Sequence, residues 1–219
     1  MHAKFWLERW RNNKTGFHQQ RYNTWLLEYW PKLELRQGAR VFVPLCGKSL
    51  DMRWLAEQGF DVRGIELSQV AVEAFFHEMG QAFEVEQRRN FKFYSGQSAA
   101  IFCGDFFDLT AGDLTGTQAL FDRGALVALP ADMRARYVDH MLRVVPDRTT
   151  LLVVTIEYDQ NLVSGPPFAV HSEEVQRLFG ARCEIERVDG ASTDEVPPHF
   201  QAQGTERFSE TVYRIVKID

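Results

Sequence analysis

Residues 40–49 read RVFVPLCGKS, and the expected fold can be built outward from them. The first half of this stretch, up to residue 45, is a short and almost continuous apolar run. Such a run is typical of a strand that is buried on both faces of a parallel sheet. Gly47 and Ser49 come next, which favours a tight turn and then a helix that ends at Gly59. The stretch therefore predicts a strand, a turn and a helix in direct succession.

The same alternation continues along the chain. Further strands are expected at residues 61–67, 91–94, 99–103, 119–122 and 150–156, and further helices at 70–80, 131–145 and 172–179. The last two strands, around 183–188 and 211–218, have no convincing helical pattern between them, so we expect them to pair as an antiparallel hairpin at the sheet edge. Strands that alternate with helices predict an α/β fold with a doubly wound, mostly parallel sheet.

The composition is that of an ordinary globular protein. The 219 residues are 45% hydrophobic, include 17 phenylalanines and carry a formal net charge of -5. We expect a single domain over residues 1–219, and no run of Lys and Arg suggests nucleic acid or an anionic membrane as a partner. No apolar run is long enough for a membrane span or a signal peptide. The three cysteines are widely spaced, which is typical of reduced thiols in the cytoplasm.

The N-terminal stretch, residues 1–30, carries bulky apolar residues at helical spacing. A polar break at residues 12–16 divides it, so one or two helices are predicted. Trp6, Trp10 and Phe17 have two interpretations. They are either ordinary core residues, or they form an aromatic lid, because aromatic faces attract a cation such as a sulfonium.

The turn after the first strand lacks the glycines of a dinucleotide site. Ligands of open α/β sheets bind at the carboxyl ends of the strands. A pyrophosphate requires several glycines there, whereas S-adenosylmethionine has no phosphate and requires fewer. The Gly-Lys-Ser at 47–49 resembles a phosphate-binding loop, but the first glycine of that motif would fall at Phe42. Phosphate-loop chemistry is therefore disfavoured.

Glu66 ends the second predicted strand and follows Gly47 by 19 residues. A carboxylate at this spacing can accept hydrogen bonds from both ribose hydroxyls of a nucleoside. The alternative is a surface carboxylate that caps the following helix.

Two further strand ends carry polar residues. Asp105 and Phe106 follow the third strand of the parallel series, where an acid and an aromatic face suit an adenine; the alternative is a plain loop acid. Asp122 and Arg123 end the fourth strand, and their alternative interpretation is a structural salt bridge.

Several motifs, in order along nearly the whole chain, resemble those of the thiopurine S-methyltransferase family. They are FWLERW at 5–10, NKTGFH at 13–18, VPLCGKSLDM at 43–52, GIELS at 64–68, FDRGALVA at 121–128, GPPF at 165–168 and the segment 174–180. The resemblance implies a Rossmann-like class I methyltransferase fold with a seven-stranded sheet. It also implies one domain in which residues 1–30 form a helical lid.

The resemblance further implies an enzyme that uses S-adenosylmethionine to methylate the sulfur of an aromatic or heteroaromatic thiol, with selenium or tellurium compounds as a second substrate class. The cofactor contacts it implies are Trp10, Leu45, Glu66, Asp105, Phe106 and Arg123. Phe17 is implied on the substrate side, and no catalytic base or metal is assigned. We expect a cytoplasmic monomer that acts on a small molecule. The alternatives are a non-catalytic S-adenosylmethionine-binding protein and an NAD-type oxidoreductase.

Overall fold

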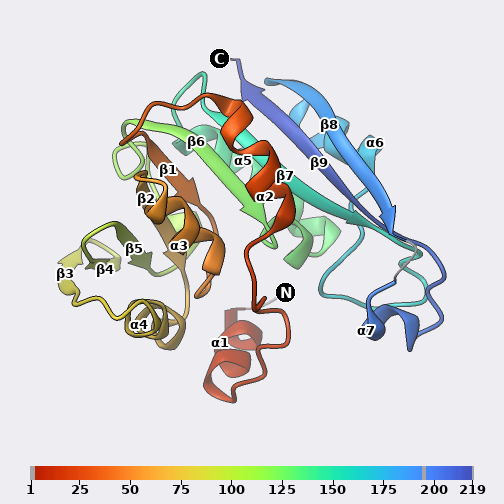
Figure 1. Ribbon diagram of the computed structural model, residues 1–219, viewed down its shortest axis with the longest axis horizontal. Helices are drawn as coiled ribbons and strands as arrows, with labels where there is room; N and C mark the ends of the chain where they lie inside the picture. The colour runs from red at the N-terminus through yellow and green to blue at the C-terminus, as the bar shows by residue number, and fades with distance from the viewer. Residues whose placement is uncertain (1–2, 194–195, 219) are drawn as a thin grey trace.

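A computed structural model describes residues 3–193 and 196–218, apart from the side chains of residues 191–193. Its centre is a sheet with nine strands among the described residues, in the order β3-β4-β5-β2-β1-β6-β7-β9-β8 (Figure 1). The strands are β1 (Arg40–Val43), β2 (Asp61–Glu66), β3 (Glu84–Arg88), β4 (Phe91–Ser95), β5 (Ala99–Cys103), β6 (Thr117–Arg123), β7 (Thr150–Glu157), β8 (Cys183–Thr193) and β9 (Phe208–Lys217). The strands from β5 to β7 in this order are all parallel, so the mostly parallel sheet predicted from the sequence is confirmed.

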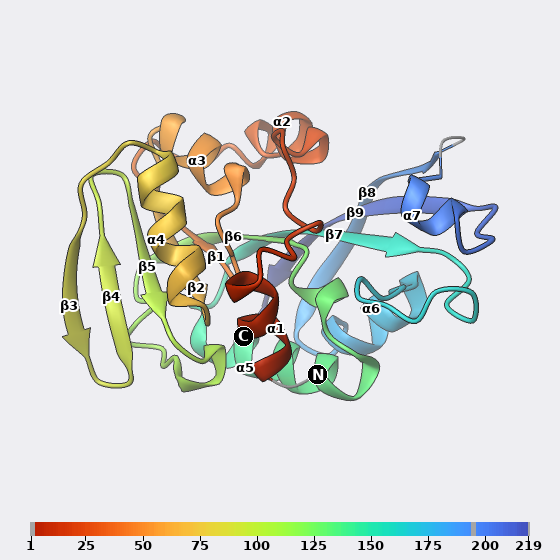
Figure 2. The same cartoon turned by 90° about the horizontal axis from the view of Figure 1, so that it is seen from below.

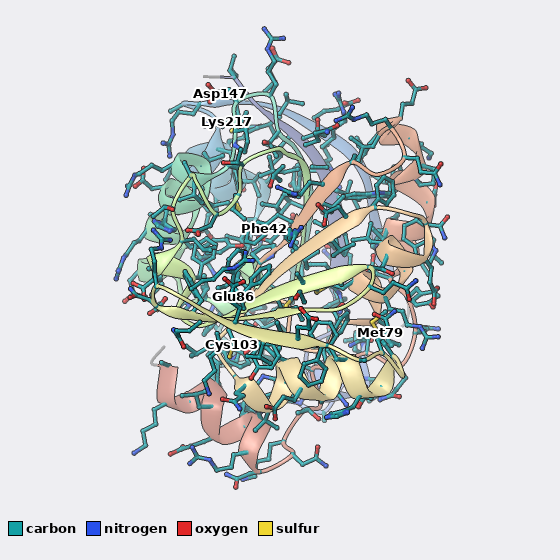
Figure 3. The ribbon with its side chains drawn as sticks, turned by 90° about the vertical axis from the view of Figure 1, so that its left-hand side faces the viewer. Phe42, Met79, Glu86, Cys103, Asp147 and Lys217 are labelled. Carbon is teal, nitrogen blue, oxygen red and sulfur yellow. The ribbon has the colours of Figure 1, made fainter. Side chains whose placement is uncertain are left out.

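The two edges of the sheet are antiparallel. At one edge β9 pairs with both β7 and β8, which confirms the predicted terminal hairpin. At the other edge β3 and β4 form a hairpin beside β5, so the described sheet has nine strands and not the expected seven. Strand β3 is not predicted from the sequence because its residues, EVEQR, show no apolar alternation; all of them are exposed. Figure 3 shows this edge, with Glu86 labelled.

Helices cover both faces of the sheet (Figure 2). The face that carries α2 (Thr24–Tyr29), α3 (Leu50–Glu57) and α4 (Gln69–Glu78) lies opposite the face that carries α5 (Ala131–Val144) and α6 (Ser172–Phe179). Side chains alternate between these faces along a strand. In β1, Val41 and Val43 belong to the core cluster on the first side, and Phe42 belongs to the cluster on the other. This double burial explains why β1 is apolar after Arg40.

The N-terminal stretch divides into two parts with different positions. Helix α1 (Ala3–Arg11) lies across the carboxyl ends of the central strands (Figure 2). Helix α2 instead packs on the sheet, where Leu26 and the following Trp30 are almost completely buried. The polar break therefore separates a helix at the carboxyl edge from a helix that belongs to the core.

Four short helices complete the described chain. They are η1 (Pro31–Leu33), η2 (Phe106–Asp108), η3 (Leu126–Ala128) and α7 (Pro198–Gln201). Helix α7 lies between β8 and β9, where no helix is predicted from the sequence; its four residues are too few to give a periodic pattern. The segments η2 and η3 directly follow β5 and β6, and so they lie at the carboxyl edge of the sheet.

Candidate active site

The turn between β1 and α3 has an unusual backbone. Leu45 and Gly47 both have positive φ angles, 45° and 54°. This region is uncommon for a residue with a side chain, and such residues are enriched at functional sites. The N–H of Cys46 donates to the carbonyl of Ile65 over 2.9 Å, so the turn is joined to β2. Ser49 then accepts a hydrogen bond from the N–H of Asp51 over 3.1 Å and caps α3, as its position in the sequence predicts.

Glu66 lies against this turn. Its Oε2 accepts the N–H of Gly47 over 2.9 Å, and its Oε1 accepts the N–H of Ser68 over 2.7 Å. Only 6% of the residue is exposed. Burial raises the pKa of the Glu66 carboxyl above the ordinary value of 4.5, while the hydrogen bonds from Ser68, Gly47 and Leu67 oppose that rise.

The alternative of a surface carboxylate that caps α4 does not fit this position. The capping contact is made by the side chain of Ser68, which accepts the N–H of Ala71 over 3.4 Å. Glu66 is instead a buried carboxylate that joins the end of β2 to the turn after β1. Its contact with ribose stays a prediction.

Three aromatic rings from the N-terminal stretch meet beside this turn. Phe17 makes edge contacts with Trp6 and Trp10, with ring centroids 5.5 Å and 5.3 Å apart. Trp10 is 7% exposed, whereas Phe17 is 38% exposed. The indole of Trp10 lies directly against Gly47. The structure therefore brings together Trp10, Gly47 and Glu66, and it leaves the Phe17 ring partly open.

The residues after β5 contact their own loop and helix α5. Asp105 is exposed and its Oδ1 accepts the N–H of Phe107 over 2.9 Å, so it caps η2. Phe106 is buried, and its ring contacts those of Tyr137 and His140 on α5, at centroid distances of 4.9 Å and 5.2 Å. The contact of Asp105 and Phe106 with adenine stays a prediction.

Arg123 does not pair with its neighbour Asp122, so the structural salt bridge considered for these residues is absent. Among the described residues, the Arg123 side chain makes no hydrogen bond or ion pair. The charge of Arg123 lies close enough to influence the pKa values of Asp51 and His18. Burial raises the pKa of Asp51, and Arg123 counteracts that rise. Burial and the charges of Lys48 and Arg123 lower the pKa of His18, while Glu78 opposes them.

Asp51 and His18 are neighbours of the site to which the sequence patterns assign no role. Asp51 is buried in the first turn of α3, and its Oδ1 accepts the N–H of Asn23 over 2.8 Å. An acid just after the glycine turn is the one signal in the sequence that points to it. The helical pattern of residues 50–56 identifies that position only as part of a helix.

Metal sites, membrane-spanning helices and surface hollows are three further features to consider in the described chain. In residues 3–193 and 196–218, no group of His, Cys, Asp or Glu side chains could hold a metal ion. No helix within the described ranges is long and apolar enough to cross a membrane. A surface hollow of about 600 Å³ lies at the end of β7, and none of the predicted site residues lines it.

Comparison with known proteins gives consistent matches. Residues 1–218 match the family model described as thiopurine S-methyltransferase. The thiopurine S-methyltransferase of Bordetella petrii is 46% identical over 215 residues, covering 98% of both chains. That of Pseudomonas putida (strain F1) is 45% identical over 215 residues, covering 98% of this chain and 99% of the relative. These matches confirm the resemblance predicted from the sequence motifs.

Solved structures with little sequence identity share the fold. One is the 1,6-didemethyltoxoflavin-N1-methyltransferase of Burkholderia thailandensis with bound 1,6-didemethyltoxoflavin and S-adenosylhomocysteine. It has a TM-score of 0.65 and 14% identity, and the match covers 99% of this chain and 87% of that chain. A TehB-like SAM-dependent methyltransferase from Corynebacterium glutamicum has a TM-score of 0.56 and 15% identity, and the match covers 99% and 98%. The class I methyltransferase fold is therefore confirmed.

Proposed function

Because the chain belongs to the thiopurine S-methyltransferase family, we propose that it transfers the methyl group of S-adenosylmethionine to the sulfur of an aromatic or heteroaromatic thiol. The observation that carries this proposal is the buried Glu66 carboxylate, which joins the turn after β1 to the end of β2. Nucleosides bind at this edge of open α/β sheets, and a carboxylate there accepts the ribose hydroxyls. The turn lacks the glycines that a pyrophosphate needs, which supports a cofactor without phosphate.

The residues around the turn fit that cofactor. When bound, S-adenosylmethionine supplies an electrophilic methyl group on a cationic sulfur. A carboxylate has about four lone-pair sites. The N–H groups of Gly47, Ser68 and Leu67 use three of those of Glu66, so acceptor capacity is left for a ribose hydroxyl. The indole of Trp10 offers an aromatic face to a cation. Leu45 shapes the turn, and Asp105 and Phe106, which follow β5 beside β2, are the proposed adenine contacts.

In this proposal Phe17 lies on the substrate side, and Arg123 acts on the charge of the substrate in addition to contacting the cofactor. The partly open ring of Phe17 offers an apolar surface to an aromatic thiol. Arg123 has no partner among the described residues, so its charge is available to stabilise a thiolate. An aromatic thiol ionises readily, so no general base is assigned. Alignment of the thiolate with the methyl group is the main contribution of the protein to the rate.

We further propose a cytoplasmic monomer that acts on a small molecule without nucleic acid. All three cysteines are free and buried, as is usual in a reducing compartment. The exposed edge strand β3 carries the charged residues Glu84, Glu86 and Arg88. Charges on an edge strand oppose pairing with another chain, which supports a monomer.

Incubation with methyl-labelled S-adenosylmethionine and thiophenol tests the proposal. Mass spectrometry should detect labelled methyl phenyl sulfide and S-adenosylhomocysteine in equal amounts. Selenophenol in a parallel reaction tests the wider substrate range. Cofactor binding without product from any thiol or selenol would identify a non-catalytic binding protein. Binding of NAD in place of S-adenosylmethionine would identify an oxidoreductase.

A further inference from the structure

A fully buried carboxylate lies at the end of β6. Asp122 has no exposed surface, and no cation pairs with it among the described residues. Its Oδ1 accepts the N–H groups of Ala125 and Leu126 over 3.2 Å and 3.0 Å. Its Oδ2 accepts the hydroxyl of Tyr137 over 2.7 Å. Burial of a carboxylate is costly unless its oxygens are hydrogen-bonded, so these three donors allow it to remain there.

The two oxygens of Asp122 hold different parts of the site. The contacts of Oδ1 with Ala125 and Leu126 hold the turn at residues 123–124, where Gly124 has a φ of 94°. They also hold the first residue of η3 in place. Arg123 lies inside this turn, so its backbone is held from both sides. Successive side chains of a strand point to opposite faces. Asp122 therefore faces Tyr137 on α5, whereas Arg123 faces the side of α3, where its charge acts on Asp51 and His18.

The contact of Oδ2 reaches the segment after β5. It holds the hydroxyl of Tyr137 on α5, and the Tyr137 ring packs against Phe106 with a centroid distance of 4.9 Å. One buried carboxylate therefore connects the ends of two neighbouring regions of the site, the turn with Arg123 and the η2 segment with Phe106.

We propose that Asp122 is the positioning residue of this methyltransferase, which orients Arg123 through the turn after β6 and Phe106 through Tyr137. Asp122 has no exposed surface, so it is not itself a contact of cofactor or substrate in this proposal. This inference rests on the proposed function, because it assigns Arg123 and Phe106 to the cofactor. A group that holds two ligand contacts in place changes affinity and rate without a contact of its own.

Asp122→Asn is the informative variant. It keeps the shape and one carbonyl oxygen for the two N–H groups, while its NH₂ can donate to the Tyr137 hydroxyl, so the fold is preserved. The affinity for S-adenosylhomocysteine, measured by calorimetry, should fall about 10-fold, because a neutral amide oxygen holds the two N–H groups of the turn less tightly than a carboxylate oxygen and so fixes Arg123 less well. Asp61→Asn is the matched control. It makes the same change at the start of β2, where Asp61 binds Arg40 and Arg63, and it should leave the affinity unchanged.

A double-mutant cycle shows whether Asp122 acts through Arg123. Arg123→Ala alone should weaken binding, and Asp122→Asn should then add less than about 3-fold in the Arg123→Ala background. Fully additive effects would overturn the proposal, and so would a change in melting temperature without a change in affinity. Tyr137→Phe removes only the Oδ2 contact and provides a second variant; it should weaken binding less than Asp122→Asn. A wild-type protein that does not bind S-adenosylhomocysteine would contradict the proposed function, whereas a wild type that binds it no more tightly than Asp122→Asn would contradict only the role of Asp122.

Discussion

The indole of Trp10 packs directly on Gly47, so that a Cβ atom built on Gly47 would lie 2.9 Å from Cζ2 of the tryptophan. Gly47 has a φ of 54°, and its N–H donates to Glu66. One glycine thus connects α1, the turn after β1 and the buried carboxylate. Any side chain at this position must displace the indole from the turn.

Gly47→Ala should impair cofactor binding as well as stability. A residue with a Cβ in left-handed conformation costs about 1–2 kcal/mol. The contact with Trp10 adds a displacement of α1 from the turn. Calorimetry with S-adenosylhomocysteine and thermal unfolding of the free protein measure the two effects separately.

Gly38→Ala is the control for this prediction. Gly38 has a φ of 75°, and nothing lies within 4 Å of the position that a Cβ atom would take there. The variant should show the cost in stability alone. If Gly47→Ala and Gly38→Ala reduced stability equally and neither changed affinity, the contact of Trp10 with the turn would have no part in binding.

The identity of the cofactor can be tested by the shift in melting temperature that each candidate ligand produces. Ligand at a hundred times its dissociation constant stabilises a protein by about 2.7 kcal/mol, which raises the melting temperature of a chain of this length by roughly 5–10 °C. S-adenosylhomocysteine should produce such a shift. NAD, FAD and ATP should not, because the turn lacks phosphate-binding glycines. A shift with NAD alone, measured by thermal unfolding, would contradict the assignment.

Cofactor affinity should weaken on acidification at a higher pH than for an exposed glutamate. Burial raises the pKa of Glu66 above 4.5. The ionised carboxylate can accept hydrogen bonds from ribose hydroxyls, whereas a protonated carboxyl loses one acceptor site to its own proton. The affinity for the cofactor should therefore be highest above the raised pKa and should fall as the pH drops through it. Calorimetry across this range measures the step. Glu66→Gln should abolish the step and weaken binding by roughly 1–3 kcal/mol at neutral pH.

The stability of the free protein has the opposite dependence on this group. Because the pKa of Glu66 is higher in the folded chain than in the unfolded chain, the folded chain binds the proton more tightly. The contribution of Glu66 to the free energy of unfolding is therefore greatest below the unfolded pKa and decreases as the pH rises through the folded pKa. Comparison of wild type and Glu66→Gln by chemical unfolding at several pH values isolates this contribution. An identical pH dependence in both proteins would exclude it.

The central strands were predictable because they are buried on both faces of the sheet. The apolar runs at β1 and β7 have no other stable environment, and the residues at their ends mark the carboxyl edge. Strand β3 was not predictable because its exposed charges make no pattern, and its pairing depends on the neighbouring β4.

The site was predictable only where a residue is specified by its neighbours in the chain. Glu66 is identified by its spacing from Gly47, and the structure places the two in contact. The partners of Asp122 were not predictable, because Tyr137 comes from α5 and no local pattern pairs them. The same holds for Asp51, whose contact with Asn23 joins segments far apart in the sequence.

The structure also limits the proposed lid to fewer residues than 1–30. Helix α2 is anchored to the sheet, since Trp25 Nε1 donates to Glu210 over 2.6 Å and the Tyr29 hydroxyl donates to Asp189. Asn23, at the start of α2, donates its N–H to the buried Asp51. We therefore expect the moving part of residues 1–30 to end before Asn23. The polar break at residues 12–16, between α1 and Phe17, is the proposed hinge.

Residues 3–22 should close over the bound cofactor, and amide exchange can show this. Exchange in this segment should slow markedly when S-adenosylhomocysteine binds, because lids are drawn from the less stable parts of a fold. Exchange in α2 should not change. Trp10→Ala should weaken ligand binding more than it lowers the melting temperature of the free protein. Trp25→Ala, the matched change in α2, should do the reverse, because Trp25 anchors the core and not the site. Equal protection of residues 3–22 with and without ligand, together with a large loss of stability in Trp10→Ala, would make α1 an ordinary part of the core.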